Sequence, residues 1–163
     1  MNSNNQIIWK NGKQWLRQLV ILHSAMTIGV VIISFMLYFI IGFHPEGEPT
    51  SSIPASGTIG TVIAFLGLII SNFLYRHRLG RIPSLGDLNA KLLHFRTAVI
   101  PSYALIQGPI LINLLIGFLD SNLLNLTVAL IMVVFLYLKR PVKDKILKDM
   151  RLSKEEIEEF ERG

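Results

Sequence analysis

The sequence contains no cysteine and has little charge for its length of 163 residues. Without cysteine, disulfides, thiolate metal sites and cysteine nucleophiles are excluded. Charged residues make up only 17% of the chain, whereas soluble domains usually carry about 25%. Hydrophobic residues make up 51%. This balance is typical of a chain that places much of its length in a membrane.

Charge is missing from four long segments. No Asp, Glu, Lys or Arg occurs in residues 18–43, 49–75, 97–119 or 121–138. Each segment is close to the roughly 20 apolar residues that a helix needs to cross the hydrocarbon core. We therefore predict an all-α membrane protein: a four-helix transmembrane bundle in residues 1–140, with spans at about 18–43, 57–75, 97–119 and 121–138. A cytoplasmic amphipathic helical tail is predicted in residues 141–163.

Several classes of function lack their usual residues. Ion-driven machinery needs a carboxylate or cation inside the membrane, and the predicted spans contain neither. The chain also lacks an H-E-x-x-H motif, a glycine-rich phosphate loop and a serine, histidine and aspartate set placed for nucleophilic attack. We therefore expect no enzyme, no cofactor and no metal site. A net charge of +5 could indicate nucleic acid, but the basic residues flank the spans as topology signals do.

Lysine and arginine concentrate in alternate segments. Residues 1–17 contain three of them, residues 44–57 none, residues 76–96 five and residues 139–163 eight. By the positive-inside rule, we expect both termini and the second loop to lie in the cytoplasm. The first apolar segment, of about 25 residues, is longer than the 7–15 residues of a signal-peptide core, so we interpret it as a retained anchor.

Two basic groups lie beside predicted spans. The first follows span two, and the second surrounds an apolar face of Val142, Ile146, Leu147 and Met150 in the tail. The first group is a topology signal, and lipid headgroups are its second expected partner. The second group suits a helix that lies on the anionic cytoplasmic leaflet, with its apolar face on the membrane or the bundle and its lysines near the headgroups. The members of the two groups are Arg76, Arg78 and Arg81, and Lys143, Lys145 and Lys148.

A second tail helix, from Lys154 to about Arg162, is predicted from the capping-box spacing of Ser153 and Glu156. We expect its acidic residues to form a solvated face rather than a docking site, because Ile157 and Phe160 offer few apolar anchors.

Small residues recur along span two at spacings of four, three and four. Such a seam lets another helix approach closely, which matters in lipid because the hydrophobic effect does not draw helices together. Packing within the chain is the favoured interpretation, and a homo-oligomer interface is the alternative. The residues are Gly60, Ala64, Gly67 and Ser71.

Span three contains two prolines, Pro101 and Pro109, and each removes a backbone donor. Gln107 lies near the middle of this span, where its amide needs a protein partner. We expect it to bind a carbonyl freed by Pro109 or to bridge to a neighbouring helix. A polar pathway is the alternative. Asn113, further along, is expected to pack toward span four and to form a hydrogen bond there.

A polar cluster is predicted near the cytoplasmic ends of the spans. His23 lies more than a turn inside span one, and Asn72, Ser102 and Tyr103 lie at comparable depth. A histidine at this place either titrates near neutral pH or serves as a satisfied packing residue, and we favour the second.

The run from Arg96 to Pro109, R-T-A-V-I-P-S-Y-A-L-I-Q-G-P, resembles a stretch found in a group of small four-span bacterial inner-membrane proteins. That stretch reads R-T-A-x-I-x-x-Y-A-L-x-E-G-P. Lys139-Arg140-Pro141 and the tail sequence L-S-K-E-E resemble the same group. The resemblance covers residues 90–160 and implies the four-span fold without a particular activity. This chain has Gln107 where the group carries glutamate, so the resemblance does not transfer a proton-carrying role.

The sequence favours a non-enzymatic membrane protein, either an accessory or assembly subunit or a homo-oligomeric scaffold. Its expected partners are the lipid bilayer and further copies of itself or other membrane protein subunits. The alternative is a small channel or transporter that uses a polar path near Gln107 and His23. A pore requires a continuous polar path, whereas a scaffold requires a dry core and an extensive contact surface.

The predicted orientation can be tested by labelling intact cells. Single cysteines are introduced at Ser51, in the first loop, and at Ser84, in the second loop, and the cells are treated with a membrane-impermeant thiol reagent. We expect labelling of Ser51→Cys only, because the first loop carries no lysine or arginine. Labelling of Ser84→Cys alone would reverse the orientation.

Overall fold

The computed structural model describes residues 12–43, 55–82, 85–121 and 123–162, and within these ranges the chain is helical with no strand. The first loop, including Ser51, and the position of Ser84 lie outside these residues. Six helices follow one another along the chain. They are α1 (Gly12–Phe43), α2 (Ala55–Leu79), α3 (Leu88–Leu119), α4 (Leu123–Leu138), α5 (Lys143–Met150) and α6 (Lys154–Arg162).

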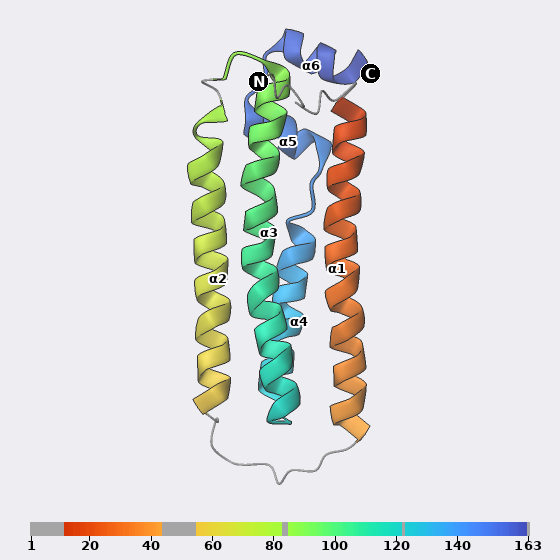
Figure 1. Cartoon of the computed structure of the whole chain (residues 1–163), viewed down its shortest axis with the longest axis vertical. Helices are drawn as coiled ribbons and strands as arrows, with labels where there is room; N and C mark the ends of the chain where they lie inside the picture. The colour runs from red at the N-terminus through yellow and green to blue at the C-terminus, as the bar shows by residue number, and fades with distance from the viewer. Residues whose placement is uncertain (1–11, 44–54, 83–84, 122, 163) are drawn as a thin grey trace, which may run out of the picture.

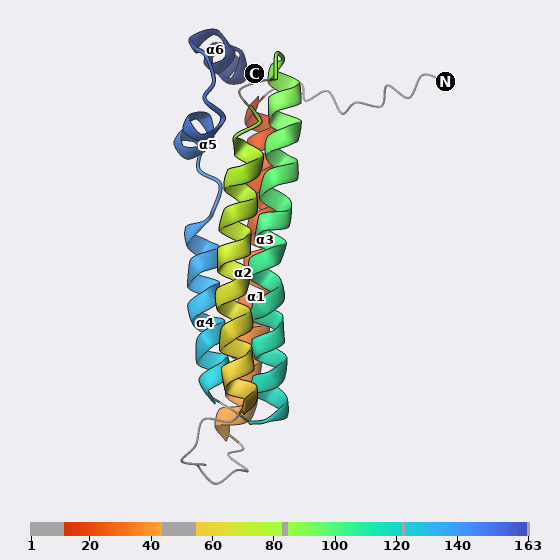
Figure 2. The same ribbon diagram turned by 90° about the vertical axis from the view of Figure 1, so that its left-hand side faces the viewer.

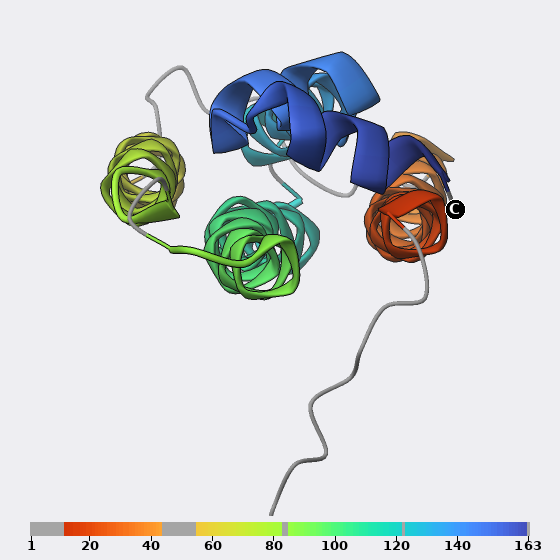
Figure 3. The ribbon, with the colours of Figure 1, turned by 90° about the horizontal axis from the view of Figure 1, so that it is seen from above.

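The four longer helices run up and down alongside one another (Figure 1). The start of α1, the connection from α2 to α3, and helices α5 and α6 lie at one end of the bundle, here called the tail end. The turn from α3 to α4 lies at the other end, here called the loop end. Seen along the bundle, α2, α3 and α1 form an arc with α3 in the middle (Figure 3). Helix α4 lies on the inner side of this arc and contacts all three helices.

Three of these helices, α1, α2 and α3, are long and apolar enough to cross a membrane. Helix α4 has only 16 residues, about 24 Å at 1.5 Å per residue. It qualifies as a fourth span only together with α5, to which it is bent by 74°. Figure 2 shows α4 stopping well short of the level that α1, α2 and α3 reach at the tail end. The chain is therefore a multi-pass membrane protein with three or four spans.

The ends of α3 follow from its sequence. Asp87 caps its start, and its carboxylate accepts a hydrogen bond of 3.3 Å from the backbone N–H of Ala90. The helix continues through Pro101 and Pro109 and ends at Leu119. Ser121 adopts a left-handed conformation, with φ of 49°, in the turn toward α4.

The seam of small residues on α2 is buried against α3 and α4. All four of its members are buried. A Cβ atom on Gly67 would lie 2.7 Å from the carbonyl oxygen of Leu105, and one on Gly60 would lie 2.5 Å from the side-chain oxygens of Asn113 and Asn125. The seam is therefore filled by contacts within the chain.

The tail helices dock on the bundle. Ile146 and Met150 of α5 are buried, while Val142 is exposed and Leu147 is partly buried against the core. The hydroxyl of Tyr75 on α2 donates a hydrogen bond of 2.6 Å to Asp149 of α5. Part of the predicted apolar face of α5 therefore rests on protein.

Helix α6 is also docked on the bundle, through one apolar residue and one carboxylate, while most of its predicted acidic face is exposed. The exposed residues of that face are Glu155, Glu158, Glu159 and Glu161. Phe160 is buried against Gly12, and its ring packs edge-on against Trp15, with the ring centroids 6.5 Å apart. Glu156 pairs with the nearly buried Lys91 of α3 at 2.6 Å. One aromatic anchor suffices because Gly12 has no side chain and leaves space for the phenylalanine ring.

The ion pair between Glu156 and Lys91 also affects the pKa of Glu156. Partial burial is the largest single effect and raises the pKa of this carboxyl group. The hydrogen bonds from Lys91 and from the backbone N–H of Ser153, together with the positive charge of Lys91, outweigh burial, so the pKa lies below its usual value. The carboxylate is therefore held in its charged form where α6 meets α3.

The close approach of α2 to α3 can be tested with Gly67→Ala. The added methyl group meets the backbone oxygen of Leu105, which cannot rotate away, so we expect a loss of about 1–3 kcal/mol of stability. Gly29→Ala is the matched control, because a Cβ atom there meets nothing within 4 Å and alanine favours helix by up to about 1 kcal/mol. Thermal unfolding in detergent should show opposite shifts, and two shifts of the same sign and size would contradict the packing.

Candidate functional site

The site is built where α4 ends inside the bundle. Pro141 has no backbone N–H and disfavours a helical conformation at the residue before it, so α4 ends at Leu138. The last carbonyl groups of a helix lack donors within the helix and need others. Here the imidazole Nε2 of His23 donates to the carbonyl oxygen of Leu136 at 3.0 Å, and the hydroxyl of Tyr103 donates to that of Lys139 at 3.0 Å.

His23 and Tyr103 form one unit across α1 and α3. Both residues are buried, and their rings pack edge to face with centroids 4.7 Å apart. Because a carbonyl oxygen only accepts hydrogen bonds, the bond to Leu136 requires the proton on Nε2 of His23. His23 is therefore placed as a cap for the end of α4.

The prolines of α3 free two further carbonyl groups, and α2 covers both. Pro101 cannot donate to Thr97, whose carbonyl oxygen accepts a hydrogen bond from the guanidinium of Arg78 instead. Pro109 cannot donate to Leu105, whose carbonyl oxygen faces Gly67 in a close backbone contact. The two prolines thus form part of the interface between α2 and α3.

Gln107 does not have the role expected from the sequence. Its side chain is partly buried and forms no hydrogen bond with the described part of the chain. The carbonyl group freed by Pro109 is covered by Gly67 of α2 instead.

Asn113 is buried, which agrees with the prediction that it packs inside the bundle. Its hydrogen-bond partners differ from the predicted ones. Its amide nitrogen donates to the carbonyl oxygens of Gly60, on α2, and Pro109, on α3, both at 2.9 Å. The predicted bond to span four is therefore wrong. Asn125 of α4 lies beside it, and its amide atoms have no hydrogen-bond partner in the described structure. The small size of Gly60 brings the α2 backbone within reach of Asn113.

A polar chain links α2 to the end of α4. The hydroxyl of Ser71 donates to the carbonyl oxygen of Ser102 at 2.7 Å, and the ammonium of Lys139 donates to the Ser71 hydroxyl at 3.3 Å. Ser71 therefore belongs both to the packing seam and to the polar site.

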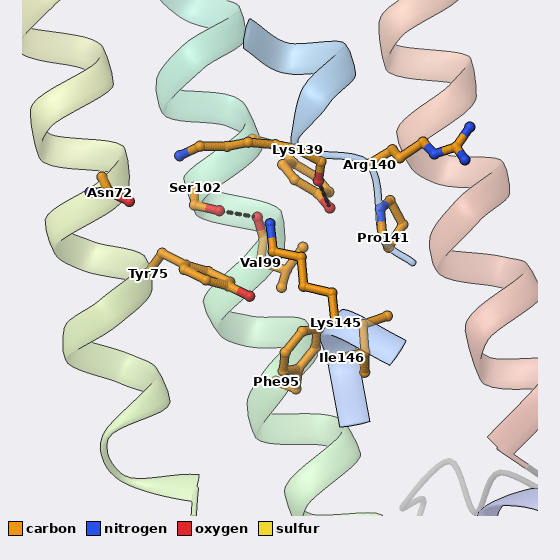
Figure 4. Close-up of a pocket in the computed structure, with 11 residues that line it drawn as sticks. Asn72, Tyr75, Phe95, Val99, Ser102, Lys139, Arg140, Pro141, Lys145 and Ile146 are labelled. Carbon is orange, nitrogen blue, oxygen red and sulfur yellow. Dashed lines mark hydrogen bonds between the residues drawn. The ribbon is translucent and has the colours of Figure 1, made fainter. Parts of the chain in front are cut away.

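A cavity of about 70 Å³ lies beside this chain (Figure 4). It is formed by α2, α3, α5 and the segment between α4 and α5. Three cations line it, and its lining contains no Asp or Glu. The lining residues are Asn72, Tyr75, Phe95, Val99, Ser102, Tyr103, Lys139, Arg140, Pro141, Lys145 and Ile146.

The three cations face different directions in Figure 4. Lys139 extends toward α2, Arg140 extends toward α1, and the ammonium of Lys145 points into the cavity. Partial burial, helped by the positive charge of Lys145, lowers the pKa of Lys139. An anion in this place would relieve the repulsion between the two lysines, so the chemistry of the cavity suits phosphate or carboxylate groups.

Three members of the predicted polar cluster, Asn72, Ser102 and Tyr103, lie together in the lining of this cavity. The fourth, His23, lies outside the lining and contacts the cluster only through its ring contact with Tyr103. Gln107 is not in the lining. Lys139 and Arg140 are site residues that the sequence pattern alone had not indicated. A signal was present, because a lysine and an arginine directly before a proline follow the last apolar residue of span four.

The predicted headgroup residues are distributed around the tail end. Arg78 is engaged with α3, and Lys143 pairs with Glu161 at 2.7 Å on the surface. The others named in the prediction are exposed. They are Arg76, Arg81, Lys145 and Lys148.

Comparison of the chain with protein-family models, curated proteins and solved structures finds no match. Function is therefore inferred from the residues and their geometry.

Proposed function

We propose that this protein is a non-enzymatic, four-span protein of a bacterial cytoplasmic membrane that acts as a scaffold by associating with further copies of itself. In this proposal α4 is the fourth span, and the tail end, with both termini, lies in the cytoplasm. An accessory subunit of another membrane complex is the second form of the same proposal.

The observation that carries the proposal is the use of the buried polar side chains. In the described helices most of these side chains bind backbone carbonyl groups and so hold one helix to the next or to itself, whereas Lys91 pairs with Glu156 and the amide of Asn125 has no partner. Thr27 and Ser34 bind carbonyl groups within α1, whereas His23, Ser71, Tyr103 and Asn113 bind carbonyl groups of other segments. Polar groups used in this way support a fixed bundle.

The alternative, a channel or transporter, finds less support. It requires a polar path joining Gln107 to His23. His23 is bound to the end of α4, and Gln107 lines neither the cavity at the tail end nor the groove between α1 and α4 described below. The two residues therefore have separate surroundings.

Charge supports the proposed orientation. Among the described residues, the lysines and arginines lie at the tail end of the bundle. At the loop end, the one charged residue among those described is Asp120. This is the asymmetry expected when the tail end faces the cytoplasm.

Helix α1 offers the surface for self-association. It packs against α3 and α4, and on another face it exposes Ile32, Phe35, Met36 and Phe39. These four side chains are between 54% and 59% exposed, and their spacing of i, i+3, i+4 and i+7 is that of a helix–helix seam. We call them the α1 stripe and propose that it pairs with the same stripe of a second copy.

Disulfide cross-linking tests this proposal directly, because the chain contains no cysteine of its own. Ile32→Cys and Met36→Cys place a thiol in the α1 stripe, and Phe65→Cys places one on the exposed face of α2, where Phe65 is 63% exposed. Oxidation in native membranes should give a covalent dimer with the two α1 variants and little with Phe65→Cys.

Three results are informative. Equal dimer formation by all variants would indicate random collision, and no dimer with either α1 variant would remove the homo-oligomeric form of the proposal. Cross-linking of the α1 variants to a different membrane protein would favour an accessory subunit.

A further inference from the structure

A groove opens where α4 ends, because α1 continues toward the tail end without its neighbour. Its volume is about 450 Å³, and its walls come from α1 on one side and from the end of α4 and the following segment on the other. Val20, Ser24 and Ile28 of α1 face Tyr137, Arg140 and Val142 across it. From Val20 to Ile28 the groove follows two turns of α1, about 12 Å.

The groove has two chemically different parts. Its walls along α1 are largely apolar and open to the side of the bundle, since Val20, Ile28 and Tyr137 are all substantially exposed. Arg140 supplies a cation at the tail end of the groove and extends toward α1 in Figure 4. Arg140 is exposed and has no ion pair or hydrogen bond from its side chain in the described structure, and the groove lining contains no Asp or Glu.

Arg140 and Pro141 line both this groove and the cavity that holds Lys139 and Lys145. The two hollows lie on opposite sides of the same short segment. An anion bound by Arg140 therefore also experiences the positive charge of the two lysines. A guanidinium binds phosphate oxygens through two parallel hydrogen bonds, which makes Arg140 the natural contact for a phosphodiester.

We propose that the groove binds one anionic phospholipid, with an acyl chain between α1 and α4 and the phosphate on Arg140. The side of a membrane bundle meets lipid, so the molecule that fills an apolar groove opening there is an acyl chain. A zwitterionic lipid brings its own ammonium group beside three cations and gains less. The site goes beyond the proposed scaffold function and does not depend on it, because the groove follows α1 from Val20 to Ile28, whereas the α1 stripe begins one turn further toward the loop end, at Ile32.

Native mass spectrometry of the full chain tests the site. The protein is purified in a mild detergent, stripped of lipid, and titrated with phosphatidylglycerol or with phosphatidylcholine of the same acyl chains. We expect phosphatidylglycerol to bind about tenfold more tightly, as a charge-assisted hydrogen bond suggests. Arg140→Gln should reduce its affinity to that of phosphatidylcholine.

Lys154→Gln is the matched control, because it removes the same charge from an exposed position on α6, away from the groove. It should bind phosphatidylglycerol like the unmodified protein. Ser24→Phe fills the groove and should weaken binding of both lipids, and Val20→Trp provides a second blocking variant if the first does not fold, as judged by thermal unfolding.

Two kinds of result would overturn the proposal. Equal affinities for the two lipids, or equal losses in Arg140→Gln and Lys154→Gln, would show that the charge of the protein as a whole attracts lipid without this site. Displacement of phosphatidylglycerol by inorganic phosphate, together with unchanged binding in folded Ser24→Phe or Val20→Trp, would show an anion site without an acyl groove.

Discussion

Helix α4 ends beside helices that continue, and the carbonyl groups at its end take donors from outside the helix. The backbone N–H of Lys139 donates to Leu136 and that of Arg140 donates to Tyr137, both at 3.1 Å, and side chains of other helices add further donors. Unsatisfied backbone groups are costly in a membrane, so each needs a donor from the protein. His23 of α1 supplies one to Leu136, and Tyr103 of α3 supplies another to Lys139. These two bonds tie α1 and α3 to the end of α4. They also fix the place where the chain leaves the bundle.

The early end of α4 has three consequences at the tail end. It places Lys139 and Arg140 on opposite sides of one short segment, so that a cavity forms toward α2 and a groove toward α1. It lets α5 turn by 74° from the direction of α4 and bury Ile146 and Met150 against the bundle. It also brings α6 over α1, where Phe160 fills the space above Gly12. Thus the early end of α4 accounts for both hollows and for the position of the tail helices.

The sequence predicted the helical class, the long apolar helices and the small-residue seam because each depends on a local pattern: uncharged length or regular spacing. It also brought Asn72, Ser102 and Tyr103 together correctly, since residues at equal depth in a bundle are neighbours. The interactions that it missed depend on tertiary contacts. The partner of the carbonyl group freed by Pro109 is Gly67, whose backbone approaches from another helix, and this leaves Gln107 without the expected role. Likewise, the docking of Phe160 depends on Gly12, at the far end of the chain.

The end of α4 is tied to α3 by the hydrogen bond from the Tyr103 hydroxyl to the carbonyl oxygen of Lys139, and Tyr103→Phe removes that hydroxyl with little change in volume. Thermal unfolding in detergent is the direct measurement, with Tyr38→Phe as the matched control, because Tyr38 is half exposed on α1. A side-chain hydrogen bond in a membrane protein contributes about 0.6 kcal/mol on average and at most about 1.7 kcal/mol. We predict a loss of stability in this range for Tyr103→Phe and no change for Tyr38→Phe. Unfolding of Tyr103→Phe at the same temperature as the unmodified protein would contradict the account.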